Sequence, residues 1–149
     1  MGFQLLMLAQ DHEHGFGRIK ERVLFDQIEQ PQGQRRRQIG FKPQAALGGL
    51  VTELLGLFNG SHLSYDLDRL NGKAPTEPAL ADMTAKAIDM LSQKEKGFFL
   101  MVEGGRIDHA LHGINAKRAL VDTIAFDDAI KAAIDKVRET DPKLENTLI

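Results

Sequence analysis

The segment from Gly97 to His112 holds the side chains best suited to chemistry in this chain of 149 residues. Glu103 ends an apolar run, and Asp108, His109 and His112 follow a glycine pair. If the backbone becomes helical after the glycines, Asp108 and His112 share one face, so a carboxylate oxygen and an imidazole nitrogen can reach a single cation. The chain has no cysteine, and oxygen plus nitrogen ligands without sulfur favour zinc in a catalytic site.

Glu103 and His109 have separate roles in this hypothesis. A lone carboxylate suits magnesium, which keeps several waters and takes few protein ligands. The glycine pair lets the backbone turn tightly between Glu103 and Asp108. His109 projects about 100° away from Asp108 around a helix and is expected to be an outer-shell group or a substrate contact. The alternative is that Asp108 caps a helix and His112 is a surface histidine, and spacing alone leaves both interpretations open.

Short apolar runs predict the strands that position these residues. Phe98 to Val102 has the length and residue types of a buried strand between glycines, which places Glu103 at a carboxyl end, where α/β sheets bind ligands. Leu54 to Phe58 predicts another strand, followed by a turn. His62 comes just after that turn and is expected at the surface rather than as a ligand. Thr147 to Ile149 indicates the start of a third strand.

Two longer segments have helical periodicity, and with the strands they predict an α/β fold. Residues 77–96 place apolar residues on one face, with the methionines in the core, and Gly97 is expected to end the helix as its C′ residue. From residue 116 a second helix is expected to run until Asp141-Pro142. Its expected apolar stripe consists of Ala116, Leu120, Ile124, Ala125, Ile130, Ile134 and Val137. Its carboxylates, Asp122 among them, are assigned to a solvated charged face.

Residues 1–46 form a segment without an assigned fold, and residues 47–149 form the domain. Residues 29–38 are polar and basic, as in a solvated loop or a disordered segment. Arg35 to Arg37 have the alternative role of a phosphate or nucleic-acid contact, disfavoured because no aromatic residue is interleaved. The histidines in Asp11-His12-Glu13-His14 alternate as strand ligands do, but an exposed turn explains them equally.

Composition restricts the possible binding partners but does not determine the location in the cell. The net charge of −2 and the pI near 6.2 give no electrostatic footprint for nucleic acid or an anionic membrane. No apolar run approaches the roughly 18 residues that span a bilayer. The first ten residues lack the basic start of a signal peptide, so the sequence leaves the localisation unknown.

Residues 97–130 resemble the central metal-binding segment of the alkaline phosphatases. The shared pattern is an apolar strand, then Val-Glu-Gly-Gly-Arg-Ile-Asp-His, two variable positions and His. Residues 54–58, 65–69 and 77–94 also resemble the preceding stretch of that family, so the resemblance covers about residues 50–149. It implies a fragment of a large mixed β-sheet flanked by helices. It also implies hydrolysis of phosphate monoesters with two zinc ions and one magnesium ion, usually by periplasmic or extracellular homodimers.

By position, the resemblance makes Glu103 the magnesium ligand, Asp108 and His112 ligands of the first zinc, and His109 an outer-shell residue near phosphate. Paired metals about 4 Å apart stabilise the attacking and leaving oxygens of phosphoryl transfer. However, the sequence has no Asp-Ser-Ala motif for the nucleophilic serine, and the chain stops before the Asp-His pair of the second zinc. We therefore expect a partial copy that is inactive alone. Residues 1–46 do not resemble the corresponding part of the family, as would be the case for a frameshifted, misassembled or fused leader. The alternative is a non-catalytic metal-binding or interaction fragment.

Overall fold

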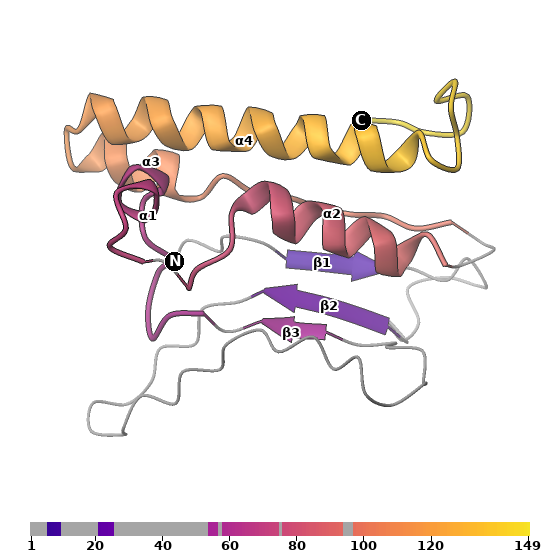
Figure 1. The fold of residues 1–149 in the computed structure, drawn as a ribbon, viewed down its shortest axis with the longest axis horizontal. Helices are drawn as coiled ribbons and strands as arrows, with labels where there is room; N and C mark the ends of the chain where they lie inside the picture. The colour runs from indigo at the N-terminus through magenta and orange to yellow at the C-terminus, as the bar shows by residue number, and fades with distance from the viewer. Residues whose placement is uncertain (1–5, 10–20, 26–53, 57, 75, 94–96) are drawn as a thin grey trace.

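A computed structural model describes residues 6–9, 21–25, 54–56, 58–74, 76–93 and 97–149 (Figure 1). Three short strands form one sheet in the order β1 (Leu6–Ala9), β2 (Glu21–Phe25) and β3 (Leu54–Gly56). β1 and β2 are antiparallel, whereas β2 and β3 are parallel. The basic segment 29–38 and the motif at residues 11–14 lie outside the described residues.

Four helices follow the strands: α1 (Asp66–Leu70), α2 (Leu80–Leu91), α3 (Arg106–His112) and α4 (Ala116–Val137). In Figure 1, α2 lies between the sheet and α4, while α1 and α3 lie near the same end of α4. α4 contacts each of the other three helices. It is therefore the element that brings α1, α2 and α3 together.

The hydrophobic core forms on the apolar face of α2, as the sequence predicted. Met83, Ala87 and Met90 recur at helical spacing and form one buried cluster. The partly buried side chains packed against that cluster are Leu54, Phe58, Leu63, Leu80, Leu100 and Val102. The helix is shorter than predicted, because it ends at Leu91. Gly97 does have a positive φ of 77°, but it comes six residues after the last helical residue, so the C′ assignment was wrong.

The predicted strand at Phe98 to Val102 is not a strand in the described structure. The segment has the alternation of a strand, because Leu100 and Val102 pack against the core under α2 while Phe99 and Met101 are exposed. A strand also needs a hydrogen-bonded neighbour. None of the described residues pairs with this segment, so the prediction of a strand was wrong, and burial holds only on the side of Leu100 and Val102.

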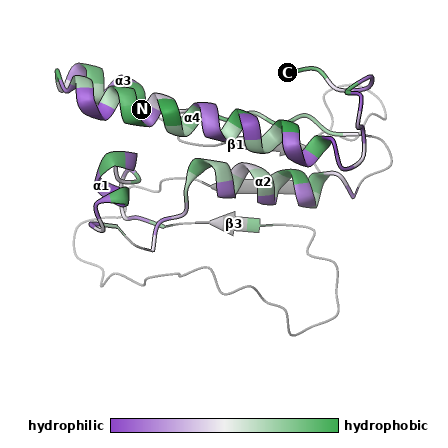
Figure 2. Ribbon diagram, turned by 45° about the horizontal axis from the view of Figure 1, so that its top comes forward, coloured by the Kyte–Doolittle hydropathy of each residue, from purple (hydrophilic) through white to green (hydrophobic). Residues whose placement is uncertain are grey.

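α4 buries a different face from the predicted one. Its buried residues are Ala119, Asp122 and Ala129, whereas Leu120 and Ile124 are 66% and 61% exposed. Small side chains on the inner face allow α4 to approach its neighbours closely, and the larger apolar residues are left on the outside. Figure 2 shows the resulting mixture of hydrophobic and hydrophilic positions along the helix.

Both ends of α4 have specific polar contacts. Asn115 is the N-cap, and its side-chain oxygen accepts a hydrogen bond from the Arg118 N–H at 3.1 Å. Near the other end, Lys136 pairs with Asp89 of α2 at 2.8 Å. α4 ends at Val137, four residues before the predicted stop at Asp141.

The C-terminal residues do not begin a strand, contrary to the prediction for Thr147 to Ile149. Asp141 organises an irregular turn instead, accepting hydrogen bonds from the backbone N–H groups of Glu145 and Asn146 and from the Thr147 hydroxyl. These hydrogen bonds, the one from Asn146 first, lower the pKa of Asp141. Among the helices that the structure describes, none has the length and apolar character needed to cross a bilayer.

Candidate functional site

Asp108 and His112 lie on one exposed face of α3. The helix begins at Arg106, directly after the glycine pair, which is the condition that the sequence argument required. Asp108 Oδ1 and His112 Nε2 are 3.4 Å apart, and the two side chains are 73% and 80% exposed. Solvent therefore reaches both atoms, and a small cation could contact both of them. Within the part of the chain described, no three Asp, Glu or His side chains come close enough together to hold a metal ion.

Glu103 lies at the start of the turn into α3 and is half-buried. The next residue, Gly104, packs against α4, and a Cβ added there would lie 3.0 Å from Ile107 Cδ1 and 3.3 Å from Phe126 Cγ. Gly105 has φ −60°, a value that any residue adopts. The structural requirement for glycine is thus the close approach of Gly104 to α4, rather than the tight turn that the sequence predicted.

His109 lies in a second set of contacts. Its Nδ1 atom is 3.2 Å from Arg106 Nη1 on the preceding turn of α3. Its ring centroid is 4.4 Å from that of His62, with the rings tilted by 53°. His62 is half-buried against His109, whereas the sequence placed it at the surface. No spacing rule could have predicted this contact, because His62 comes from the loop before α1.

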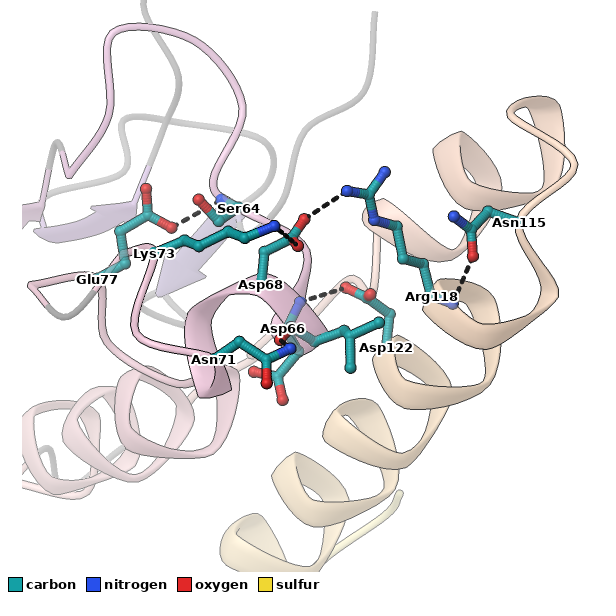
Figure 3. Close-up of polar contacts among 10 residues, drawn as sticks. Ser64, Asp66, Asp68, Asn71, Lys73, Glu77, Asn115, Arg118 and Asp122 are labelled. Atoms are coloured by element: carbon teal, nitrogen blue, oxygen red, sulfur yellow. Dashed lines mark hydrogen bonds and ion pairs between the residues drawn. The ribbon is translucent and has the colours of Figure 1, made fainter.

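Tyr65, the residue before α1, connects α3 with α4. Its ring centroid lies 3.8 Å from the Arg106 guanidinium carbon and 4.4 Å from that of Arg118. Arg118 also forms a 2.7 Å ion pair with Asp68 (Figure 3). Lys73 contacts the other oxygen of the same carboxylate at 3.2 Å. Cation–π attraction of one tyrosine ring to two guanidinium groups stabilises this arrangement, so α1, α3 and α4 are joined beside His109.

Asp122 is the buried carboxylate of this region, and its assignment to a solvated face was wrong. It is 7% exposed, and its Oδ1 accepts a long hydrogen bond of 3.4 Å from the Asp66 N–H (Figure 3). Its Oδ2 has no hydrogen-bond partner among the described residues. Loss of hydration on burial raises its pKa to about 6, against the lowering effects of the Asp66 N–H and of Arg106.

A small cavity lies beside Asp122, between α1 and the start of α2. Its polar lining residues are Ser64, Asp66, Arg69, Glu77 and Asp122, and its volume is about 30 Å³. The buried Glu77 carboxylate is already occupied, accepting from Asn59 Nδ2 at 2.6 Å and from the Ser64 N–H at 2.7 Å. A volume of this size holds about one or two water molecules. The cavity is therefore too small for a phosphate ester, and the exposed end of α3 is the better candidate site.

Comparison with known proteins gives one consistent result. The family model for alkaline phosphatase matches residues 9–148. A membrane-bound alkaline phosphatase of Bombyx mori is 56% identical over 86 residues, which is 58% of this chain and 15% of the relative. The tissue-nonspecific alkaline phosphatases of Gallus gallus and Homo sapiens are 49% and 47% identical over 83 residues, 56% of this chain and 15% of each relative. The division at residue 46 stays a prediction.

Proposed function

The chain belongs to the alkaline phosphatase family, and we propose that it carries one part of a metal-dependent phosphomonoesterase site. In this proposal Asp108 and His112 bind zinc, and Glu103 binds magnesium. His109 is an outer-shell residue near the phosphate. The substrates of the whole enzyme are small phosphate monoesters.

One observation carries the zinc assignment, namely the 3.4 Å separation of Asp108 Oδ1 and His112 Nε2. With zinc–ligand distances of about 2.0 to 2.2 Å and a tetrahedral angle, two ligand atoms of one zinc ion are about 3.4 Å apart. The exposed pair therefore fits two positions of such a site without rearrangement. An exposed His–Asp ion pair also explains the contact, so metal affinity must be measured.

When bound, zinc and magnesium supply Lewis acidity and neutralise charge on the phosphoryl oxygens. The residues of this chain contribute orientation. α3 holds Asp108 and His112 on one face, and Gly104 allows the turn that carries Glu103 to pack against Phe126 of α4. The half-buried Glu103 then offers one carboxylate to a hard cation.

We propose that the 149 residues alone do not hydrolyse phosphate esters. None of the three serines, Ser61, Ser64 and Ser92, has an Asp-Ser-Ala context. Two protein ligands are also fewer than the three that catalytic zinc sites usually have. In a whole enzyme, the segment from Phe98 to Val102 would join a large mixed sheet flanked by helices, in a homodimer in the periplasm or outside the cell. The alternative function is a non-catalytic metal-binding or interaction fragment.

Zinc titration of the purified chain tests the proposal. We expect Asp108→Ala and His112→Ala each to weaken zinc binding at least about tenfold, since each removes one of two ligands. The matched control is Asp135→Ala, which removes the carboxylate of an exposed ion pair with the same spacing, Lys131–Asp135 on α4. Equal zinc affinity in wild type and Asp108→Ala would refute the zinc site.

A phosphatase assay tests the inactivity. The chain loaded with zinc and magnesium is expected to leave p-nitrophenyl phosphate uncleaved. Hydrolysis that disappears in Asp108→Ala would show that the chain is a complete catalyst and would reject this part of the proposal.

A further inference from the structure

Arg106 is held in place beside the candidate site by contacts that a surface arginine normally lacks. Its guanidinium lies over the Tyr65 ring at 3.8 Å. Its Nε atom is buried and has no hydrogen-bond partner in the described part of the chain. Among the described residues, Arg106 forms one hydrogen bond to a side chain, which joins its Nη1 to His109 Nδ1 at 3.2 Å. The contact with the Tyr65 ring holds the guanidinium in place, and the hydrogen bond connects it to the imidazole.

The chemistry of the two groups determines the direction of that hydrogen bond. A guanidinium has five N–H donors and no acceptor. His109 Nδ1 must therefore accept, and a neutral imidazole that accepts at Nδ1 carries its hydrogen on Nε2.

From this contact we infer that Arg106 is a positioning residue that holds His109 in the Nε2–H tautomer. In that state both ring nitrogens are committed, one to Arg106 and one to its own hydrogen. His109 is then a hydrogen-bond donor to an oxyanion such as a phosphoryl oxygen, and it has no lone pair for a metal ion. The inference rests on the proposed function for the identity of the oxyanion only.

Two further contacts lie beside the pair of Arg106 and His109. His62 packs against His109 with a centroid distance of 4.4 Å. Arg118 stacks on the same Tyr65 ring as Arg106, and Asp68 pairs with Arg118 at 2.7 Å. The support for Arg106 therefore comes from Tyr65, the residue before α1, whereas the group that Arg106 orients is one turn along α3.

Nitrogen-15 NMR of the full chain with labelled histidine and arginine tests the tautomer directly. At a pH about two units above the ordinary histidine pKa of roughly 6.5, we expect the His109 signals of a pure Nε2–H ring and a coupling between Arg106 Nη1 and His109 Nδ1 across the hydrogen bond. Arg106→Met should let both tautomers of His109 appear. Arg118→Met is the matched control, because it removes a guanidinium from the same tyrosine without touching His109, and it should leave the tautomer unchanged.

Arg106→Lys provides a second variant if the methionine variant fails to fold. Lysine keeps the charge but loses the planar fork that lies over Tyr65, so we expect both tautomers of His109 to appear here as well. An Nδ1–H signal for His109 in the wild type, or a pure Nε2–H ring in both Arg106 variants, would overturn the inference.

Inorganic phosphate probes the donor role separately. Added to the chain loaded with zinc and magnesium, it should move the His109 Nε2–H proton resonance downfield in the wild type and not in Arg106→Met. A pure Nε2–H ring that ignores phosphate would reject the donor role and leave the tautomer assignment standing. Zinc binding that is independent of Asp108 would instead reject the proposed function.

Discussion

Replacing Asp122 with asparagine should make the chain more stable at neutral pH and should remove a component of its pH dependence. Burial raises the pKa of Asp122 from an ordinary value of 3.8 to about 6. Each pKa unit corresponds to about 1.4 kcal/mol, so ionised Asp122 costs on the order of 2 to 3 kcal/mol in the folded chain. Asparagine keeps the oxygen that accepts from the Asp66 N–H and has no charge to bury.

The sign follows from proton linkage. Between about pH 4 and pH 6 the folded chain holds a proton on Asp122 that the unfolded chain has lost, so the free energy of unfolding falls as pH rises through this window. The stabilising contribution is complete below the unfolded pKa and is lost above the folded one. Most paired carboxylates act in the opposite direction, as Asp135 should, because its hydrogen bond to Lys131 lowers its pKa.

Urea unfolding from pH 4 to pH 8, followed by helical circular dichroism, measures this effect. Relative to wild type, Asp122→Asn should gain stability with increasing pH, approaching about 2 to 3 kcal/mol above pH 7. Asp135→Asn, an exposed control on the same helix, should show no such gain. If wild type and Asp122→Asn show the same pH dependence, then Asp122 titrates normally and the argument from burial is wrong.

Three substitutions test the packing. Gly104→Ala forces a Cβ to 3.0 Å from Ile107 Cδ1 and 3.3 Å from the Phe126 ring. We expect the free energy of unfolding in urea to fall by about 1 to 3 kcal/mol. The control is Gly60→Ala, which has nothing within 4 Å of its Cβ and should change stability by less than about 0.5 kcal/mol. Met83→Ala should lower the free energy of unfolding by about 2 to 5 kcal/mol, because Met83 is buried in the core formed by α2. Leu120→Ala, on the exposed side of α4, should lower it far less. Equal losses would refute the assignment of the buried face. Asn115→Ala removes the α4 cap, so we expect the free energy of unfolding to fall by about 1 kcal/mol and the melting temperature to fall with it. An unchanged melt would show that the cap adds nothing.

Local patterns in the sequence predicted the local structure well. The spacing of Met83, Ala87 and Met90 located the core face of α2, because a helix facing a sheet must bury one apolar side. The structure also meets the condition set for residues after the glycine pair, because α3 begins there and places Asp108 and His112 on one face.

Two predictions that required knowledge of a partner element failed. The apolar run from Phe98 to Val102 indicated a buried strand, but length and residue types do not provide a neighbouring strand. For α4, hydrophobicity selected Leu120 and Ile124, whereas the structure buries Ala119, Asp122 and Ala129. Close helix packing favours small side chains there, and ranking residues by hydrophobicity does not detect that preference.

The two halves of the candidate site depend differently on the rest of the fold. Asp108 and His112 meet through i,i+4 spacing alone, so their contact needs only the turn of α3. Arg106 and His109 also share one helix face, but the guanidinium takes its orientation from Tyr65, which precedes α1. Disrupting the packing of α1 should therefore release the His109 tautomer before it separates the zinc-binding pair. Tyr65→Leu tests this order, since it should abolish the coupling between Arg106 and His109 while zinc affinity stays within about twofold of wild type.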